Sequence, residues 1–306
     1  MSTGNTQTHQ PSPSSRGFEV KKRNPWPLVA GLAALVVVAA VVIFATFGRP
    51  VALGGAHFGS KLKVAYLSSD AAQEAFLKYI SKDVAPGYGI EVEPVGIGDP
   101  NQLHAAVSSG EFAGTIYAHK PWLEQSNAAN GWTLVPLEPT FQWAYSLWSS
   151  KYKNLEGLPQ GARIGILNDP ANTAQALLLL ANNNVITLKQ GIDPAKASVK
   201  DIASNPKGFQ FIPIAFGTAA RTLDDFDAII SYNFEFIAAK TPAEYKIFAP
   251  EAPLVFAAQL AVSKPYVEEK NIVQLVKAFG DPKVQTYLAT TDEPAVKGNL
   301  APVSKK

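Results

Sequence analysis

The sequence contains no cysteine, and this absence excludes several classes of protein at once. A disulfide scaffold, a thiolate zinc site and a cysteine nucleophile all require a thiol. Attachment of a lipid to a cysteine after export requires one as well. Whatever holds this chain together, or holds it at a membrane, must therefore use other chemistry.

A strong charge of one sign and the common catalytic motifs are also missing. Lys and Arg number 27 and Asp and Glu number 25, which gives a net charge of +2. There is no basic face and no nucleic-acid-binding signature, so we expect no nucleic-acid partner. The sequence has no Gly-x-Ser-x-Gly elbow, no phosphate-binding glycine loop and no His-Glu-x-x-His pair. We expect neither an enzyme nor a cofactor.

Metal-ligand patterns are similarly weak. The 4 histidines are dispersed, and none of them forms a pair with zinc spacing. Asp224, Asp225 and Asp227 form an acidic group that could suggest a divalent cation. Because the group directly precedes a predicted buried strand, we interpret it as a helix–strand turn and expect no metal site.

The sequence does contain a long uncharged apolar run near its start. Residues 27–47 have no charged side chain, and at about 1.5 Å per residue they span roughly 31 Å, the hydrocarbon thickness of a bilayer. Basic residues at 21–23 precede this run, and only Arg49 follows closely. The asymmetry predicts a single-pass segment in the cell membrane, with the N-terminus in the cytoplasm and the main domain extracytoplasmic.

The segments on either side of this run are polar or rich in glycine. Residues 1–26 have no apolar periodicity and end in the basic flank, so we expect a disordered cytoplasmic segment. Residues 48–60 contain several glycines and should form a flexible spacer. The apolar run is longer than that of an ordinary signal peptide, which favours an uncleaved signal anchor over a cleaved leader.

From residue 61 onward, strand and helix patterns alternate. Alternating or continuous apolar runs predict strands, and helical spacing of apolar residues predicts helices. The expected strands are 61–67, 90–95, 112–117, 132–137, 141–148, 164–167, 209–214, 227–232 and 252–262. The alternation predicts a doubly wound α/β protein, and a chain of this length should divide into two lobes with a crevice between them.

The stretch from residue 164 to residue 180 carries the first site prediction. Residues 164–167 form a short apolar run suited to a buried strand, and residues 168–170 are a turn signal. Asn172 or Thr173 is expected to cap the helix that follows, with Gln175 in its first turn. Such a turn is where open α/β sheets bind small polar ligands, although an ordinary strand–helix connection is the alternative.

Residues 112–125, Phe-Ala-Gly-Thr-Ile-Tyr-Ala-His-Lys-Pro-Trp-Leu-Glu-Gln, resemble the NlpA-type lipoprotein family, the substrate-binding proteins of methionine-type ABC importers. The similarity continues in order through 140–141, 168–172, 177–180 and 221–225. The resemblance implies a type II periplasmic-binding-protein-like fold, in which two α/β lobes close over a ligand in the cleft between them by hinge motion. It also implies an ABC permease and ATPase as partners.

With two crossovers between the lobes, we expect lobe 1 to comprise 61–146 plus 256–306, and lobe 2 to comprise 147–255. An aromatic cluster lies near the first crossover: Phe141, Trp143, Tyr145 and Trp148. We interpret this cluster as core and crossover packing, with room for one ring to face the cleft.

The family pattern also implies the ligand-binding residues. Tyr117, His119, Trp122 and Asn172 keep it. The family Arg that holds the ligand carboxylate is replaced here by Gln175, and a bidentate ion pair of that kind is worth about 1.5–3 kcal/mol.

Two further family positions have changed. A family Asn falls on Tyr232, or on Asn233 with a shift of one residue, and another falls on Phe256. We include these three residues with Gln175 in the expected site. The resemblance therefore implies that the aromatic and polar residues of the pocket are kept, whereas the binding of an amino acid is weakened.

These observations predict a membrane-anchored extracytoplasmic solute-binding protein of an ABC importer. It would capture a small polar or amino-acid-like ligand, with methionine itself disfavoured. One alternative is a transport-inactive scaffold or envelope interaction protein with the same fold. The other is an exported enzyme, for which His119 is the candidate titratable residue.

Overall fold

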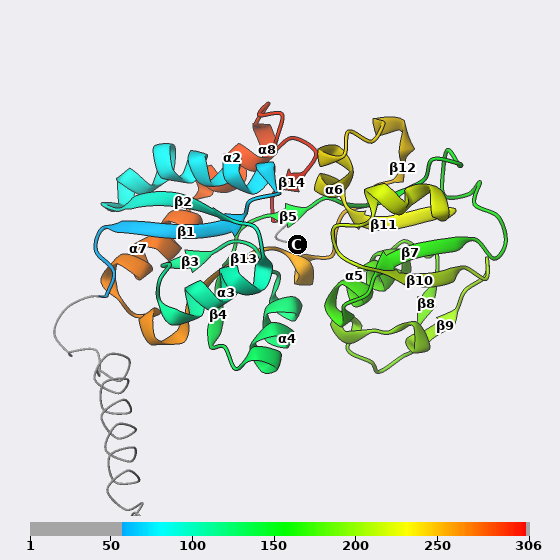
Figure 1. Ribbon diagram of the computed structural model, residues 1–306, viewed down its shortest axis with the longest axis horizontal. Helices are drawn as coiled ribbons and strands as arrows, with labels where there is room; N and C mark the ends of the chain where they lie inside the picture. The colour runs from blue at the N-terminus through cyan, green and yellow to red at the C-terminus, as the bar shows by residue number, and fades with distance from the viewer. Residues whose placement is uncertain (1–56, 304–306) are drawn as a thin grey trace, which may run out of the picture. The chain divides into compact units, whose positions relative to one another are not determined.

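Two five-stranded β-sheets organise residues 57–303, the part of the chain that the computed structural model describes (Figure 1). The first sheet contains β1 (Lys61–Leu67), β2 (Glu91–Ile97), β3 (Gly114–Thr115), β4 (Leu134–Pro139) and β13 (Gln259–Ser263), in the order β2-β1-β3-β13-β4. The second sheet contains β6 (Tyr145–Trp148), β7 (Arg163–Leu167), β10 (Gln210–Ile214), β11 (Ala228–Tyr232) and β12 (Lys246–Phe248), in the order β10-β7-β11-β6-β12. Two small pairs accompany them: β5 (Gln142–Trp143) with β14 (Leu300–Ala301), and β8 (Thr187–Leu188) with β9 (Ile202–Ser204).

Several of the helices that connect these strands share one way of starting. The helices are α2 (Ala71–Tyr79), α3 (Pro100–Ser109), α4 (Lys120–Asn130), α5 (Pro170–Asn182), α6 (Asn233–Ala238), α7 (Lys270–Phe279) and α8 (Pro282–Thr290). An aspartate caps α3, α5 and α8 from the residue before a proline at the first helical position. The carboxylate satisfies a free backbone N–H group, and the proline ring supplies a helical φ without needing a donor.

Shorter 3-10 turns join the larger elements, and one π-turn extends α2. They are η1 (Ile80–Val84), η2 (Ala85–Tyr88), η3 (Pro194–Lys196), η4 (Val199–Asp201), η5 (Ala220–Asp225), η6 (Ala243–Tyr245), η7 (Leu254–Phe256) and η8 (Lys264–Tyr266).

Both sheets have the same strand directions. In the first, β1 runs parallel to β2 and β3, and β13 runs antiparallel to β3 and β4. In the second, β7 runs parallel to β10 and β11, and β6 runs antiparallel to β11 and β12. The antiparallel strand is in each case the first one formed after the chain crosses from the other sheet. This arrangement is the α/β fold that the sequence predicted, with each sheet and its helices forming one lobe.

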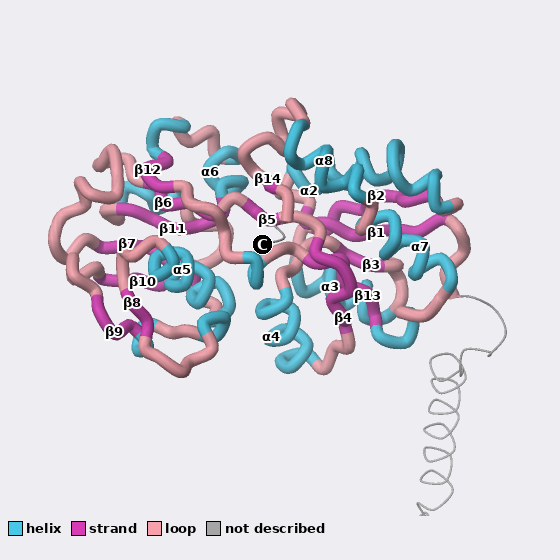
Figure 2. The backbone as a smooth tube through the Cα atoms, turned by 180° about the vertical axis from the view of Figure 1, so that it is seen from behind, coloured by secondary structure: helices cyan, strands magenta, loops and turns pink. Residues whose placement is uncertain are grey.

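The two crossing segments are hydrogen-bonded to each other. The amide of Thr140 donates to the carbonyl of Ala258 at 2.8 Å, and the amide of Ala258 donates to the carbonyl of Phe141 at 2.8 Å. Close to these bonds, β5 pairs with β14, and Figure 2 shows this pair between the two groups of strands. Backbone pairs of this kind leave few dihedral angles to absorb a rotation, so they define where a hinge would lie.

The structure corrects two expected strands and locates one boundary. The expected strand 141–148 is divided at Ala144, whose amide donates to the carbonyl of Asn299 at 2.7 Å in register with the β5–β14 pair, whereas β6 beyond it pairs with β11 and β12. Three residues of the expected strand 252–262 form the 3-10 turn η7, which follows Pro253, and β13 begins only at Gln259. The expected lobe boundary after residue 146 falls inside β6.

The predicted membrane segment 27–47 and the segments on either side of it, up to residue 56, lie outside the described residues. Among residues 57–303, no helix has both the length and the apolar character to cross a bilayer.

A substitution at Gly114 tests how closely β3 approaches β13. A methyl group at this position would lie 3.0 Å from the backbone carbonyl oxygen of Ala261, which the sheet holds in place. We expect Gly114→Ala to lower the free energy of unfolding by about 1–3 kcal/mol, measured by denaturant titration. Gly59→Ala is the control, because no described residue lies within 4 Å of its added methyl group. Equal stability of the two variants would contradict the packing described here.

Candidate ligand-binding site

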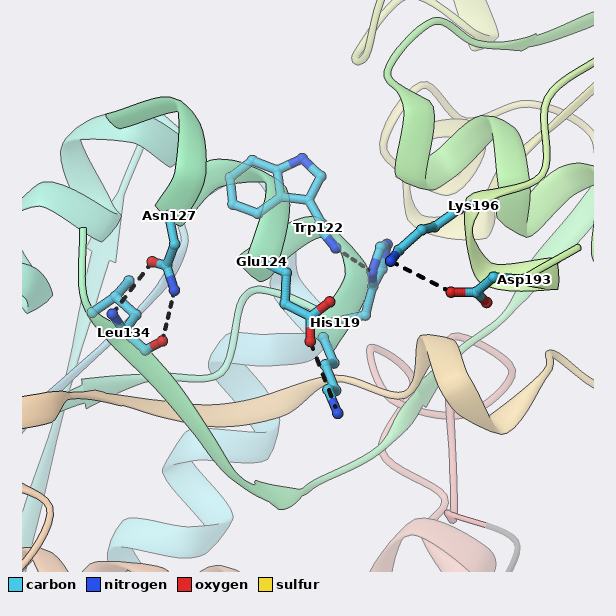
Figure 3. Close-up of polar contacts among 8 residues, drawn as sticks. His119, Trp122, Glu124, Asn127, Leu134, Asp193 and Lys196 are labelled. Atoms are coloured by element: carbon cyan, nitrogen blue, oxygen red, sulfur yellow. Dashed lines mark hydrogen bonds and ion pairs between the residues drawn. The ribbon is translucent and has the colours of Figure 1, made fainter. Parts of the chain in front are cut away.

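The first side of the candidate site is the start of α4, where His119 is the N-cap. Its Nδ1 atom accepts a hydrogen bond from the backbone N–H of Trp122 at 3.2 Å (Figure 3). Nδ1 therefore carries no proton, and in the neutral ring the proton lies on Nε2. Burial lowers the pKa of His119 to about 4, so the ring is neutral at pH 7.

The second side is the start of α5, where Asp169 is the N-cap. One carboxylate oxygen accepts from the backbone N–H of Asn172 at 3.0 Å, and the other accepts from the Asn172 side-chain amide at 2.7 Å. The expectation that Asn172 or Thr173 would cap this helix is therefore wrong: Asp169 does so, ahead of Pro170. Because its NH2 group is held by Asp169, Asn172 presents its carbonyl oxygen Oδ1 to the cleft.

One hydrogen bond joins the two sides. The Nε2–H group of His119 donates to Oδ1 of Asn172 at 3.3 Å. The same oxygen accepts from the hydroxyl of Tyr232, at the end of β11, at 2.6 Å. Both lone pairs of the Asn172 carbonyl are thus used, one by each lobe.

The Tyr232 hydroxyl also contacts Gln175. The distance from Oη to the side-chain oxygen of Gln175 is 3.1 Å. A hydroxyl has a single proton, and the 2.6 Å contact with Asn172 takes it. With the Gln175 amide turned so that its NH2 faces Oη, Tyr232 accepts one bond and donates the other.

These residues surround a small cavity between the lobes. Its lining consists of Tyr117, Ala118, His119, Trp122, Trp143, Asn172, Phe216, Tyr232 and Phe234. The space in which the centre of a water molecule can lie is ≈ 20 Å³, about enough for one water. A ligand with several heavy atoms therefore needs the lobes to move apart before it can enter.

The structure brings five of the eight expected residues together on the cavity wall: Tyr117, His119, Trp122, Asn172 and Tyr232. Gln175 lies behind Tyr232. The Phe256 ring packs edge-on against His119, with centroids 5.2 Å apart, and does not line the cavity. Their role in ligand binding stays a prediction.

Asn233 does not reach the cavity wall. Its side-chain oxygen accepts from the indole N–H of Trp148 at 3.2 Å, and its NH2 group donates to the carbonyl of Gly298 at 3.2 Å. Of the two alignments that the sequence left open, Tyr232 is the residue at the cavity and Asn233 is part of the packing behind it.

Three lining residues, Ala118, Phe216 and Phe234, were not expected, and Trp143 had been assigned to a cluster of which one ring could face the cleft. Phe216 follows the carboxyl end of β10, and Phe234 follows that of β11. Ligand crevices in such sheets lie beyond the carboxyl ends of the parallel strands. That rule, applied to all predicted strands and not only to residues 164–167, would have indicated both phenylalanines.

Buried carboxyl groups lie close to the cavity. Asp70 is buried behind Trp143 and accepts from its indole N–H at 3.0 Å. Burial raises the pKa of Asp70, although four hydrogen-bond donors oppose that shift. Burial, together with the charges of Asp169 and Glu235, also raises the pKa of Tyr117. No Lys or Arg is among the described residues that line this cavity.

Glu235, in the first turn of α6, is the second buried carboxyl group nearby. Its Oε1 accepts from the hydroxyl of Ser231 at 2.8 Å, and its Oε2 makes no hydrogen bond of normal geometry to any described residue. Burial raises its pKa, and the nearby amides of Ala219 and Gly217 offset part of this effect.

A wider groove lies at the mouth of the cleft, between the first turns of α4 and α5. Its volume is ≈ 750 Å³, and it is lined in part by Lys120, Glu124, Asp193 and Lys196. These residues form two exposed ion pairs, Lys120–Glu124 at 3.9 Å and Lys196–Asp193 at 3.6 Å, and Figure 3 draws the second of them. The groove is the candidate entrance to the cavity.

Comparisons with known proteins agree with this architecture. The profile of the NlpA lipoprotein family matches residues 62–303. Lipoprotein 28 of Escherichia coli (strain K12) is 28% identical over 218 residues, covering 70% of this chain and 80% of the relative. The D-methionine-binding lipoprotein MetQ of Salmonella typhi is 28% identical over 216 residues, covering 70% and 79%.

Solved structures are similar as well. An ABC transporter periplasmic substrate-binding protein from Coxiella burnetii has a TM-score of 0.66 and 28% identity, covering 79% of this chain and 99% of that one. A nutrient binding protein from Burkholderia cenocepacia bound to methionine has a TM-score of 0.63 and 26% identity, covering 79% and 98%.

A buried histidine behind the cavity leads to a pH prediction. His104 packs against Tyr117 and Trp122, and burial lowers its pKa to about 4 from 6.5. Between these values the unfolded chain binds more protons than the folded chain, so stability falls as the pH is lowered. We expect the parent to lose roughly 2 kcal/mol more than His104→Phe between pH 7 and pH 4.5.

The measurement is urea unfolding of both proteins at the two pH values. The comparison isolates His104, because the buried carboxyl groups and His119 contribute equally to both proteins. An identical loss of stability in the two proteins would show that His104 is not held neutral by its surroundings.

Proposed function

The chain belongs to the NlpA lipoprotein family, and on that premise we propose that it is the extracytoplasmic solute-binding protein of an ABC importer. The observation that carries the proposal is the cavity between the lobes, closed by residues of both and located beyond the carboxyl ends of their parallel strands. The relatives named as periplasmic substrate-binding and methionine-binding proteins support it.

Capture of the ligand would use the hinge and the hydrogen bond across the cleft. Rotation about residues 140–144 and 249–258 would separate His119 from Asn172 and open the cavity toward the entrance groove. Closure would restore that bond over the ligand and exclude water. The permease and ATPase of the importer would then recognise the closed form.

Attachment to the membrane would be through residues 27–47. The relatives include proteins named as lipoproteins, whereas this chain has no cysteine to carry a lipid. An uncharged apolar run after a basic cluster supplies the alternative, with the binding domain on the outer face of the cell membrane.

The ligand of this site would differ from a free amino acid held by its carboxylate. Three side-chain donors at the polar end of the cavity have partners within the protein: His119 and Tyr232 donate to Asn172, and Asn172 donates to Asp169. Gln175 replaces the family Arg and lies behind Tyr232. A transport-inactive scaffold would have the same internally hydrogen-bonded arrangement, which supports that second candidate.

Isolation of the full-length chain from solubilised native membranes distinguishes the two functions. An importer component should be recovered together with a permease and an ATPase at comparable amounts. Recovery of other envelope proteins without either subunit would favour the scaffold. A matched isolation of His119→Asn, which retains a capping side chain but cannot reach Asn172, controls for partners that depend on the closed form.

Returning two positions to the residues that the family similarity implies should restore the binding of an amino acid. Gln175→Arg combined with Tyr232→Asn would expose a guanidinium group to the cavity, because the ring that separates residue 175 from it is gone. We expect methionine to bind the double variant roughly 10–100-fold more tightly than the parent in calorimetric titration.

Gln175→Arg alone is the control and should give no gain, because Tyr232 still lies between the side chain and the cavity. A gain from the single variant equal to that of the double variant would contradict the position assigned to Tyr232.

A further inference from the structure

Aromatic rings from both lobes form a continuous wall around the cavity. Centroids of Tyr117 and Trp122 are 5.6 Å apart, and those of Tyr117 and Trp143 are 6.5 Å apart. Tyr232 continues the series, 5.6 Å from Trp143 and 5.5 Å from Phe234. The complete set is Tyr117, Trp122, Trp143, Phe216, Tyr232 and Phe234.

Most neighbouring rings of the wall meet at large angles, whereas Tyr232 and Phe234 are stacked with an interplanar angle of 22°. Tyr117 is T-shaped to Trp122 at 83° and to Trp143 at 70°, and Trp143 is T-shaped to Tyr232 at 69°. When neighbouring rings around a cavity lie at large interplanar angles, some of the ring faces point into the cavity. Each face carries negative quadrupole density, so such a space attracts a cation without needing a hydrogen bond.

The ionisable groups behind the aromatic wall are carboxyl groups, whose negative form attracts a cation. Asp70 is hydrogen-bonded to the indole of Trp143, which increases the electron density of that ring. Glu235 is next to Phe234 in the chain and has a carboxyl oxygen without a hydrogen bond of normal geometry to the described residues. Asp169 lies behind Asn172. Within the described part of the chain, no basic residue lines the cavity to balance these groups.

The polar end of the cavity does not suit an anion. The protons of His119, Asn172 and Tyr232 that lie nearest to the cavity are all donated within the protein. A carboxylate placed there would break these bonds and face the buried carboxyl groups. A group with positive charge and no N–H donors would leave the bonds intact.

We propose that this cavity takes a small alkylated ammonium group, such as a trimethylammonium head, held by cation–π contacts with rings of both lobes. The proposal rests on the function proposed above and names the chemical class of its ligand. Opening of the hinge would admit the head group, and closure would bring Phe216 and Phe234 of the second lobe against Tyr117 and Trp122 of the first.

Calorimetric titration of the full-length chain in detergent tests the proposal with three probes. Choline carries the trimethylammonium group, 3,3-dimethyl-1-butanol is its uncharged isostere, and methionine is the amino acid named for the relatives. We expect choline to bind at least 10-fold more tightly than the isostere and than methionine. Equal or tighter binding of the isostere would show that the cavity recognises shape alone, and no binding of choline would overturn the proposal.

Variants of the wall give a second readout. Phe216→Leu and Phe234→Leu keep an apolar side chain and remove the ring face, so choline affinity should fall several-fold while isostere affinity changes little. Phe248→Leu is the matched control, because Phe248 is a half-buried ring in β12 that does not line the cavity. Equal losses for choline and the isostere would overturn the cation–π assignment.

The outcome is separable from that of the proposed function. If choline fails to bind while the permease and ATPase are recovered with the chain, the importer role stands and the ligand class is wrong. If choline binds and neither subunit is recovered, the ligand class stands and the importer role is wrong.

Discussion

The carbonyl oxygen of Asn172 is the point at which the two lobes meet. It accepts one hydrogen bond from His119 of the first lobe and one from Tyr232 of the second. Other contacts orient one of the donors and the acceptor: the Trp122 amide fixes the His119 tautomer, and Asp169 fixes the orientation of the Asn172 amide. The position of the cavity, its closure and its neutral polar end all depend on this oxygen.

The same arrangement supports the ligand class proposed above. The motif similarity implies an Arg and an Asn in the family where this chain has Gln175, which is uncharged, and Tyr232, which contacts it. A buried polar group without a partner costs free energy, so the similarity implies that the two differences are physically linked. The rest of the cavity is aromatic, and the buried charges near it are negative.

Much of the fold followed from the sequence because its signals are local. Alternating apolar residues define the strand 61–67, and Asp169 before Pro170 fixes the turn after residue 167. The crossing segments were less clear, because residues 252–258 are apolar like a strand but pair only briefly. Their conformation depends on contacts with Thr140 and Phe141, far away in the chain.

The site was predicted in part for a similar reason. Motif similarity located Tyr117, His119 and Asn172, which lie in the first turns of helices or at the ends of strands. It could not decide between Tyr232 and Asn233, since that choice depends on which side chain the end of β11 directs into the cleft. Phe216 and Phe234 carry no motif, and only the sheet order brings them to the same cavity.

The most direct test of this account is the distance between the lobes in solution. Because the chain has no cysteine, Ala128→Cys on α4 and Lys196→Cys on η3 would place two spin labels on exposed positions of opposite lobes. Pulsed electron paramagnetic resonance would compare this protein with the same protein carrying His119→Asn, which can still cap α4 but cannot reach Asn172. The account predicts a longer and broader distance distribution when the His119–Asn172 bond is lost, and an unchanged distribution would contradict it.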